Sequence, residues 1–218
     1  MARIVQLFLI ATLTTSFAYS YLEPIPITVY YESLCSDSIR FILKKLATTY
    51  NQKDYDFASL LSKLTLVPYG NVKVISADNY QYQCQHGPPE CEGNKLHGCA
   101  VKYFTDKSKL LNYIGCLMEK SIKVILSRAP FPVGECQNEI PVEIRSKIAQ
   151  CYNTNEGWDQ FNLNGYYSNM AFGRNRHFIP LITFRNVTDE NISKWAFTDF
   201  RRTLCLQYGL TNPACTDG

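Results

Sequence analysis

The alternation of apolar and polar residues predicts the first elements of the chain. Residues 27–31 are apolar at nearly every position, which is typical of a strand buried on both faces. From about residue 37 to 50 the apolar residues recur every three or four positions, as on one face of a helix. Strand-like segments follow at 65–69 and 72–75, around the turn residues Gly70-Asn71. This order predicts a right-handed βαβ unit with parallel strands.

The pattern changes between about residues 76 and 173, where cysteines, turn residues and helical periodicity dominate. A helix is predicted at 109–126 and ends before the Pro- and Gly-containing segment 129–134. Pro141 then suits the first turn of another helix that continues to Tyr152. We interpret residues 76–173 as a helical insertion that disulfides attach to the sheet.

The C-terminal part predicts one more strand and a closing helix. Residues 178–184 are strongly apolar and contain Pro180, which is unusual inside a strand because proline lacks a ladder donor. Residues from about 190 to 207 carry an apolar face at helical spacing. Gly209 suits the end of that helix, and Pro213 lies beyond it.

A lone cysteine, Cys35, lies between the first strand and the first helix, where Ser36 offers a capping oxygen. A thiol there faces unpaired backbone N–H groups and the positive end of the helix dipole, and both favour the thiolate. Asp37 should oppose them and raise the pKa, so the sequence leaves the net shift open. A strand followed by a cysteine, two residues and a helix is the order found in a thioredoxin-like redox site. In such a site Pro180 would be a cis-proline beside Cys35. The usual spacing is Cys-x-x-Cys, but the fourth position here is Ser38.

Residues 1–20 have the features of a secretory signal peptide: Arg3, an apolar run, and the small-x-small site Ala18-Tyr19-Ser20. Residues 21–218 are enough for a single domain. No later apolar run reaches the roughly 18 residues needed to span a bilayer, so stable membrane insertion is not expected. The formal net charge of +3 is spread without a dense basic block, which argues against nucleic acid as a partner.

The cysteine count indicates an oxidising compartment and a disulfide framework. Nine cysteines is an odd number, so one sulfur is left over. If Cys35 is that one, the other eight can form up to four bridges among 105 pairings, and the sequence does not fix which. The one pair we predict is Cys205 with Cys215, which flank a turn. The eight are Cys84, Cys91, Cys99, Cys116, Cys136, Cys151, Cys205 and Cys215.

Two sequons, Asn186-Val-Thr188 and Asn191-Ile-Ser193, predict N-glycans on a surface segment. They agree with a protein that passes through the secretory pathway and is secreted or lysosomal.

The segment from Cys84 to Cys99 holds two histidines and three cysteines within 16 residues, a combination that can bind zinc. However, six and seven residues separate successive cysteines, unlike the short knuckle of zinc sites, and the compartment favours oxidation. We therefore expect no metal here, and a disulfide-stapled loop held by a Gly-Pro-Pro turn. His86 and His97 are expected to be turn or interface residues, and His177, close to Pro180, a packing residue.

The same segment resembles the signature of the gamma-interferon-inducible lysosomal thiol reductase (GILT) family. That signature is Cys-Gln-His-Gly, two residues, Glu-Cys, two residues, Asn, four residues and Cys, and every fixed position is filled here. The resemblance extends to Val67-Pro-Tyr-Gly70 and His177-Phe-Ile-Pro180, and covers the chain from about Pro24 to Cys215.

The resemblance implies a thioredoxin-like α/β fold with a disulfide-rich helical insertion, and the reduction of protein disulfides in the endocytic and lysosomal pathway. It also implies a role in immunity and no cofactor beyond a thiol donor. In the family reaction one thiolate attacks a substrate disulfide and a second thiol resolves the mixed disulfide. Cys35 matches the first position and Pro180 the cis-proline, whereas Ser38 stands in place of the second cysteine.

Three hypotheses follow from that replacement. Cys35 acts as a single-thiol oxidoreductase, hydrogen-bonded by Ser38, and an external thiol such as glutathione or cysteine releases the product. Alternatively, the protein has lost turnover and is a GILT-like binding or host-defence protein, or another cysteine moves in as the resolving thiol. Against all three, Cys35 could be merely an unpaired structural thiol.

Overall fold

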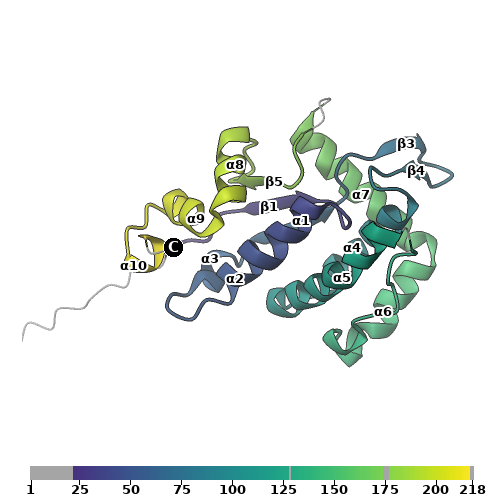
Figure 1. Cartoon of the computed structure of the whole chain (residues 1–218), viewed down its shortest axis with the longest axis horizontal. Helices are drawn as coiled ribbons and strands as arrows, with labels where there is room; N and C mark the ends of the chain where they lie inside the picture. Colours follow the sequence, from purple (N-terminus) through teal and green to yellow (C-terminus); the bar gives the residue numbers. More distant parts are fainter. Residues whose placement is uncertain (1–21, 128, 174–176, 217–218) are drawn as a thin grey trace, which may run out of the picture.

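The computed structural model describes residues 22–127, 129–173 and 177–216, so the predicted signal peptide lies outside the described residues. The protein is a mixed α/β structure built on a three-stranded sheet in the order β2-β1-β5 (Figure 1). Strand β1 (Ile27–Tyr31) pairs in parallel with β2 (Leu64–Pro68), which confirms the predicted parallel pair. Strand β5 (Leu181–Phe184) runs antiparallel on the other edge of β1.

The predicted helix after β1 is present, with a π-helical segment at its centre. It comprises α1 (Ser36–Phe41), η1 (Ile42–Leu46) and α2 (Ala47–Tyr50), and it lies across β1 in Figure 1. Its apolar face is buried, as the spacing predicts, and a short helix, α3 (Phe57–Leu60), leads into β2. The β1–α1 junction therefore rests on the main core.

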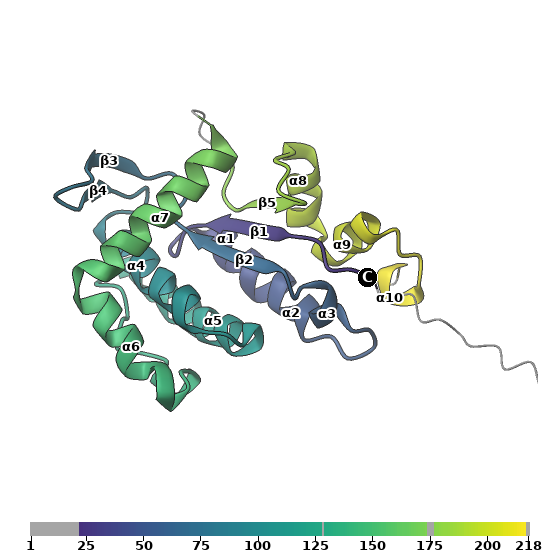
Figure 2. The ribbon, with the colours of Figure 1, turned by 180° about the vertical axis from the view of Figure 1, so that it is seen from behind.

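Residues 76–173 are largely helical, as predicted. Helices α5 (Lys107–Ser127) and α6 (Val142–Asn153) match the predicted ones within a few residues, and a 3-10 turn, η2 (Gln137–Glu139), lies between them. Helix α7 (Asn155–Phe172) then returns toward the sheet and crosses near the end of β2 (Figure 2).

The stapled loop predicted from Cys84 to Cys99 is wrong, because helix α4 (Pro88–Tyr103) occupies most of it. Gly87, with φ +89°, turns the chain, and Pro88 occupies the first helical turn, where its missing N–H costs nothing. Buried residues run almost without a break from Glu90 to Ala100, since other helices surround α4. A helix buried on all sides shows no apolar stripe, which is why periodicity missed it.

A small hairpin, β3 (Lys73–Ser76) and β4 (Gln81–Gln83), packs against α7. Its Tyr82 ring stacks on Trp158, with centroids 5.5 Å apart. On the same helix Gly165 lets the backbone approach the Tyr69 ring, just after β2, because a Cβ there would lie 2.7 Å from that ring.

The C-terminal part differs from prediction at two places. The prediction of a single closing helix is wrong. Helices α8 (Glu190–Thr198) and α9 (Phe200–Tyr208) are separate, because Asp199 caps α9 by accepting the Arg202 N–H. Gly209, with φ +66°, ends α9 as predicted, and α10 (Pro213–Thr216) follows. Pro180 precedes β5 instead of lying within a strand.

The eight paired cysteines form four disulfides, and the predicted Cys205–Cys215 pair is confirmed. All nine cysteines lie in the described residues, and Cys35 alone is not bridged. The expected attachment of the insertion to the sheet by disulfides is wrong, since its bridges join the parts of this region to one another. They are Cys84–Cys91, Cys99–Cys151 and Cys116–Cys136.

None of the helices in the described part of the chain combines the length and apolar character that crossing a bilayer requires.

Candidate active site

Cys35 lies where the sequence places it, at the N-cap of α1, and its side chain is half-buried. Its Sγ lies 3.6 Å from the Ile179 carbonyl oxygen, to which the thiol donates a hydrogen bond. The Ile179–Pro180 peptide is cis, as predicted. The fold thus brings Cys35 and Pro180 together from positions 145 residues apart in the chain.

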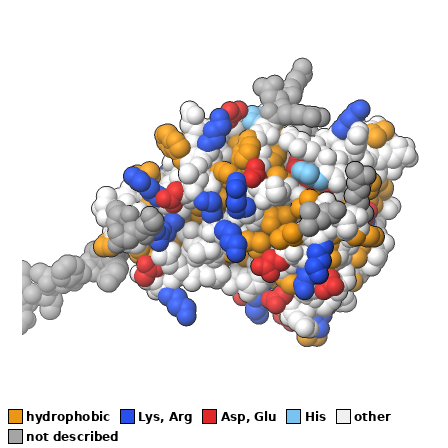
Figure 3. Space-filling view, in the orientation of Figure 1, with side chains coloured by type: hydrophobic (Ala, Val, Ile, Leu, Met, Phe, Trp, Pro, Cys, Tyr) orange, Lys and Arg blue, Asp and Glu red, His pale blue; other side chains and the backbone are white. Residues whose placement is uncertain are grey.

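Apolar side chains surround this junction. Cys35 packs against a cluster formed by Phe172, Ile179 and Leu181, to which Tyr30 also contributes. Apolar side chains also gather on the face that carries α1 and α5 (Figure 3). On α5, Ile122 is 46% exposed and Ile125 is 42% exposed. The sulfur therefore lies against a buried apolar cluster.

The pKa of Cys35 is raised, and burial is the main cause, because a thiolate is poorly solvated there. Hydrogen bonds from the Ser38 N–H and hydroxyl, and from the Asp37 N–H, act in the opposite direction. The carboxylate that raises the Cys35 pKa is that of Glu32, while the Asp37 carboxylate pairs with Arg40 at 2.9 Å. The net shift of the Cys35 pKa, which the sequence left open, is therefore upward. The carboxylate that contributes to it is that of Glu32 and not, as we expected, that of Asp37.

Ser38 is fully buried beneath Cys35. Its Oγ accepts a hydrogen bond from the Glu32 N–H at 3.3 Å. The hydroxyl proton then remains to be donated toward the Cys35 sulfur, the interaction that lowers the pKa of that thiol. Ser38 thus connects the cysteine to the end of β1.

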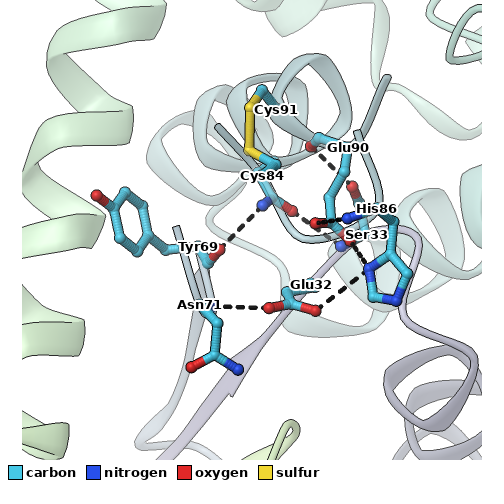
Figure 4. The surroundings of a disulfide bond; sticks show 9 residues. Glu32, Ser33, Tyr69, Asn71, Cys84, His86, Glu90 and Cys91 are labelled. Atoms are coloured by element: carbon cyan, nitrogen blue, oxygen red, sulfur yellow. Dashed lines mark hydrogen bonds and ion pairs between the residues drawn. A yellow bond between two sulfur atoms is a disulfide. The ribbon is translucent and has the colours of Figure 1, made fainter. Parts of the chain in front are cut away.

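Glu32, His86 and Glu90 form a polar cluster beside the β1–α1 junction (Figure 4). The His86 Nδ1 atom lies 2.5 Å from Glu90 Oε2 and 3.4 Å from Glu32 Oε2. Burial, with the nearby charge of Glu90, raises the pKa of Glu32 to about 7. The hydrogen bond to Glu90 raises the pKa of His86. Two almost inaccessible carboxyl groups thus share one imidazole.

Residues of the Cys84–Cys99 segment hold the loop that carries Cys35. The Asn94 Oδ1 accepts the Ser33 N–H at 2.8 Å, and its amide donates to the Tyr69 carbonyl at 3.1 Å. The Ser33 hydroxyl donates to the Glu90 carbonyl at 3.1 Å. The Asn94 side chain and the Glu90 carbonyl of α4 therefore hold the loop between β1 and Cys35 in place.

The other histidines are packing residues. His97 was expected at a turn or interface, but it is completely buried, where burial lowers its pKa to about 3 and its Nδ1 lies 3.1 Å from the Tyr31 hydroxyl. His177 packs on the Phe172 ring, as expected, and its Nδ1 lies 3.2 Å from Glu190.

Comparison with known proteins identifies the family. The sequence profile of the gamma interferon inducible lysosomal thiol reductase (GILT) family matches residues 26–140. The chain belongs to the GILT family. It is 30% identical over 206 residues to a gamma-interferon-inducible lysosomal thiol reductase-like protein of Anopheles gambiae, covering 88% of this chain and 80% of the relative. GILT-like protein 1 of Drosophila melanogaster is 28% identical over 221 residues, covering 97% and 85% respectively.

The names of the family and of these relatives indicate a lysosomal thiol reductase-type function. The family signature, residues 84–99, forms the turn before α4 and the greater part of that helix, instead of the stapled loop that the sequence predicted. Its Cys84–Cys91 disulfide fixes that turn, and the signature residues His86, Glu90 and Asn94 all face the loop before Cys35. All three cysteines of the signature are in disulfides, so none of them is available as a zinc ligand in this structure.

Sequence reasoning missed Glu32 and Glu90 as residues of the candidate site. A signal for Glu32 exists, because a carboxylate there interrupts an otherwise apolar junction three residues before Cys35. Glu90 is a fixed position of the GILT signature. What the sequence lacks is any indication that the two carboxyl groups, 58 residues apart, meet.

The raised pKa of Cys35 predicts how its alkylation by iodoacetamide depends on pH. A raised pKa leaves less thiolate at a given pH, so the rate should still be rising above the ordinary cysteine pKa of about 8.5. Glu32→Gln removes the charge that raises the Cys35 pKa, so above about pH 7 the variant should react faster. Below that pH Glu32 holds a proton and the two rates should converge. The rates should be measured with EDTA present, so that no metal ion alters the charge near Cys35. Equal alkylation rates for the wild type and Glu32→Gln at every pH would show that Glu32 does not act on Cys35.

Proposed function

We propose that the chain is a thiol–disulfide oxidoreductase that attacks protein disulfides through the single thiol of Cys35. The observation that carries this proposal is the placement of the unbridged sulfur. It lies at the N-terminus of α1, 3.6 Å from the carbonyl oxygen that precedes cis-Pro180. The apolar residues around it suit a peptide segment of a substrate protein.

We also propose that the fold is thioredoxin-like, with the disulfide-rich region of about 76–173 as an insertion in a single domain spanning 21–218. The parallel β1–β2 pair joined by a helix, and an antiparallel β5 that follows a cis-proline, support this. In such a fold Pro180 would shape the groove in which a substrate lies beside Cys35.

The proposed reaction needs an external thiol. The Cys35 thiolate attacks one sulfur of a substrate disulfide, forming a mixed disulfide, and the second substrate sulfur leaves as a thiolate that takes a proton from water. A glutathione thiolate then attacks the Cys35 sulfur and releases the second substrate thiol. Another glutathione restores Cys35, so two glutathione molecules become one disulfide while one substrate disulfide becomes two thiols.

Ser38 has a supporting role in this scheme. Its N–H and hydroxyl donate to the Cys35 sulfur and lower its pKa, which partly offsets burial. It cannot resolve the mixed disulfide, because oxygen does not form the S–S bond. The other eight cysteines are all bridged, which argues against one of them taking that part.

A second candidate function is retention of disulfide partners without turnover, as a GILT-like binding or host-defence protein. Two features favour it. The raised pKa of Cys35 makes its thiolate a poorer leaving group, which slows release of the partner, and Ser38 cannot supply a resolving thiol. In this case the mixed disulfide would be the product.

We propose N-glycans at Asn186 and Asn191 and a destination that is secreted or lysosomal. Both side chains are exposed, as oligosaccharide transfer requires. The compartment would also supply the thiol donor.

An insulin reduction assay with the glycosylated mature protein tests the proposal. With glutathione present, at acidic and neutral pH, the wild type should accelerate reduction, and Cys35→Ala should lower the rate to the glutathione background because the attacking sulfur is gone. Ser36→Ala, an exposed neighbour, serves as the matched control and should retain activity. Equal rates for wild type and Cys35→Ala would remove Cys35 from the reaction. A stable mixed disulfide without acceleration would favour the binding function.

A further inference from the structure

The cluster of Glu32, His86 and Glu90 has the arrangement of a metal site. In each carboxylate a backbone N–H holds the Oε1 atom: Asn71 N–H donates to Glu32 at 2.7 Å, and His86 N–H to Glu90 at 3.0 Å. Both Oε2 atoms are thereby directed at His86 Nδ1, at 3.4 and 2.5 Å (Figure 4). One potential ligand atom from each residue lies within 4.8 Å of the other two.

One of these atoms lacks a hydrogen-bond partner. Glu32 Oε2 is buried, in a side chain that is 1% exposed, and accepts no hydrogen bond from any residue the structure describes. An unpaired carboxylate oxygen in such a position is costly, since it has given up water without compensation. The atom points toward the other two ligand atoms, so a cation among the three would satisfy it.

The surroundings fix the position of this carboxylate. Gly70 has φ +68°, and a Cβ there would lie 2.1 Å from Glu32 Cγ and 2.3 Å from Oε1. The chain thus passes directly over the carboxylate with no side chain between. On the opposite side Glu90 is completely buried in the first turn of α4. Ligands held by their neighbours in this way need little rearrangement to bind a metal.

Charge and access also fit a divalent cation. When both carboxylates are ionised and the imidazole is neutral, as in a metal complex, the three side chains carry two negative charges, which a dication offsets. His86 is the exposed member and lines a cavity of about 520 Å³ together with Leu34 and Pro88, which provides a path from solvent. One nitrogen and two oxygen ligands suit Zn²⁺, with bonds of about 2.0–2.2 Å and a fourth position left for water.

We propose that Glu32, His86 and Glu90 bind one Zn²⁺ ion. The ion joins the end of β1, which leads to Cys35, to the turn before α4 and to α4 itself. Its ligands differ from those that the cysteine-rich sequence suggested, because the cysteines are bridged and carboxylates take their place. The inference does not depend on the reductase function.

Isothermal titration of the chelator-treated mature protein with ZnCl₂ at neutral pH tests the site. One ion per chain is expected, and Zn²⁺ should raise the thermal unfolding midpoint because it binds only the folded protein. Co²⁺ should give the visible absorption of a low-symmetry nitrogen–oxygen site without the intense band of a thiolate ligand. Absence of a stoichiometric Zn²⁺ site in the wild type would overturn the proposal.

Three variants locate the ion. His86→Gln and Glu90→Gln should each weaken Zn²⁺ affinity at least ~10-fold. His86→Gln is decisive if Glu90→Gln fails to fold, because His86 is exposed. Cys35→Ala should bind Zn²⁺ like the wild type, and loss of binding there would place the ion on the thiol instead. His177→Gln is the matched control, since it breaks a histidine–glutamate pair with one exposed carboxylate. Affinity unchanged in His86→Gln would also overturn the proposal.

Discussion

Ser38→Cys is expected to release reduced substrate without added glutathione. The Ser38 hydroxyl already contacts the Cys35 sulfur through a hydrogen bond, so a sulfur in its place would lie within reach of a mixed disulfide on Cys35. A thiol held beside its target acts at an effective concentration far above that of a dissolved thiol. In a single turnover of the pre-reduced enzyme with insulin and no added thiol, release of the reduced insulin chains should be at least ~100-fold faster than in the wild type.

The structure also indicates that Ser38→Cys lowers the stability of the protein. Ser38 is fully buried and accepts the Glu32 N–H, and sulfur is a larger and weaker acceptor. We expect a loss of about 1 kcal/mol in the free energy of unfolding. Mass spectrometry of the oxidised variant should find a new internal disulfide involving Cys35. Ser36→Cys is the control: it places an exposed thiol next to Cys35, but adjacent residues on a helix do not face each other. If the two variants behave alike, the position of the second sulfur is irrelevant and the mechanism is wrong.

Asn94→Ala is expected to destabilise the protein more than most single substitutions. The Asn94 side chain is completely buried and bridges the Ser33 N–H and the Tyr69 carbonyl. Alanine leaves both groups unpaired and a small cavity, for a loss of about 3 kcal/mol. For a chain of this size, the thermal midpoint should fall by roughly 6–12 °C.

Asn153→Ala provides the matched comparison in thermal unfolding. Its amide donates to the Ala149 carbonyl from an exposed position on α6, so the change should stay within about 0.5 kcal/mol. Comparable losses in the two variants would mean that the link between α4 and the Cys35 loop adds little stability. Because Ser33 precedes Cys35 by two residues, Asn94→Ala should also slow the reductase reaction.

The sequence allowed the local elements around Cys35 to be predicted closely, because each has its own signal. The continuous apolar run gave β1, the three- and four-residue spacing gave the helix after it, and the odd number of cysteines singled out Cys35. The cis bond at Pro180 was predicted from the likeness of the Cys35 region to a thioredoxin-like redox site, in which a cis-proline lies beside the cysteine.

The contacts between distant elements were not predictable in the same way. Helix α4 is buried on nearly every side, but its buried residues include the polar Glu90, Asn94 and His97, so its sequence shows no apolar stripe. The meeting of Glu32 with Glu90 depends on how α4 packs beneath β1, and no local pattern encodes that packing. The same holds for the disulfides: Cys205–Cys215 closes a short turn, whereas Cys99–Cys151 joins two helices 52 residues apart.

The four disulfides are buried to different degrees, so they should differ in how easily the external thiol of the proposed reaction reduces them. Cys84, Cys91, Cys99, Cys151, Cys205 and Cys215 are at most 5% exposed, so a dissolved thiol cannot reach those sulfurs without local opening. Cys116 and Cys136 are only partly buried, and their bridge connects the middle of α5 to the turn before η2. In the proposed reaction, a glutathione concentration high enough to regenerate Cys35 would therefore reduce the Cys116–Cys136 disulfide first. The three buried disulfides would stay intact.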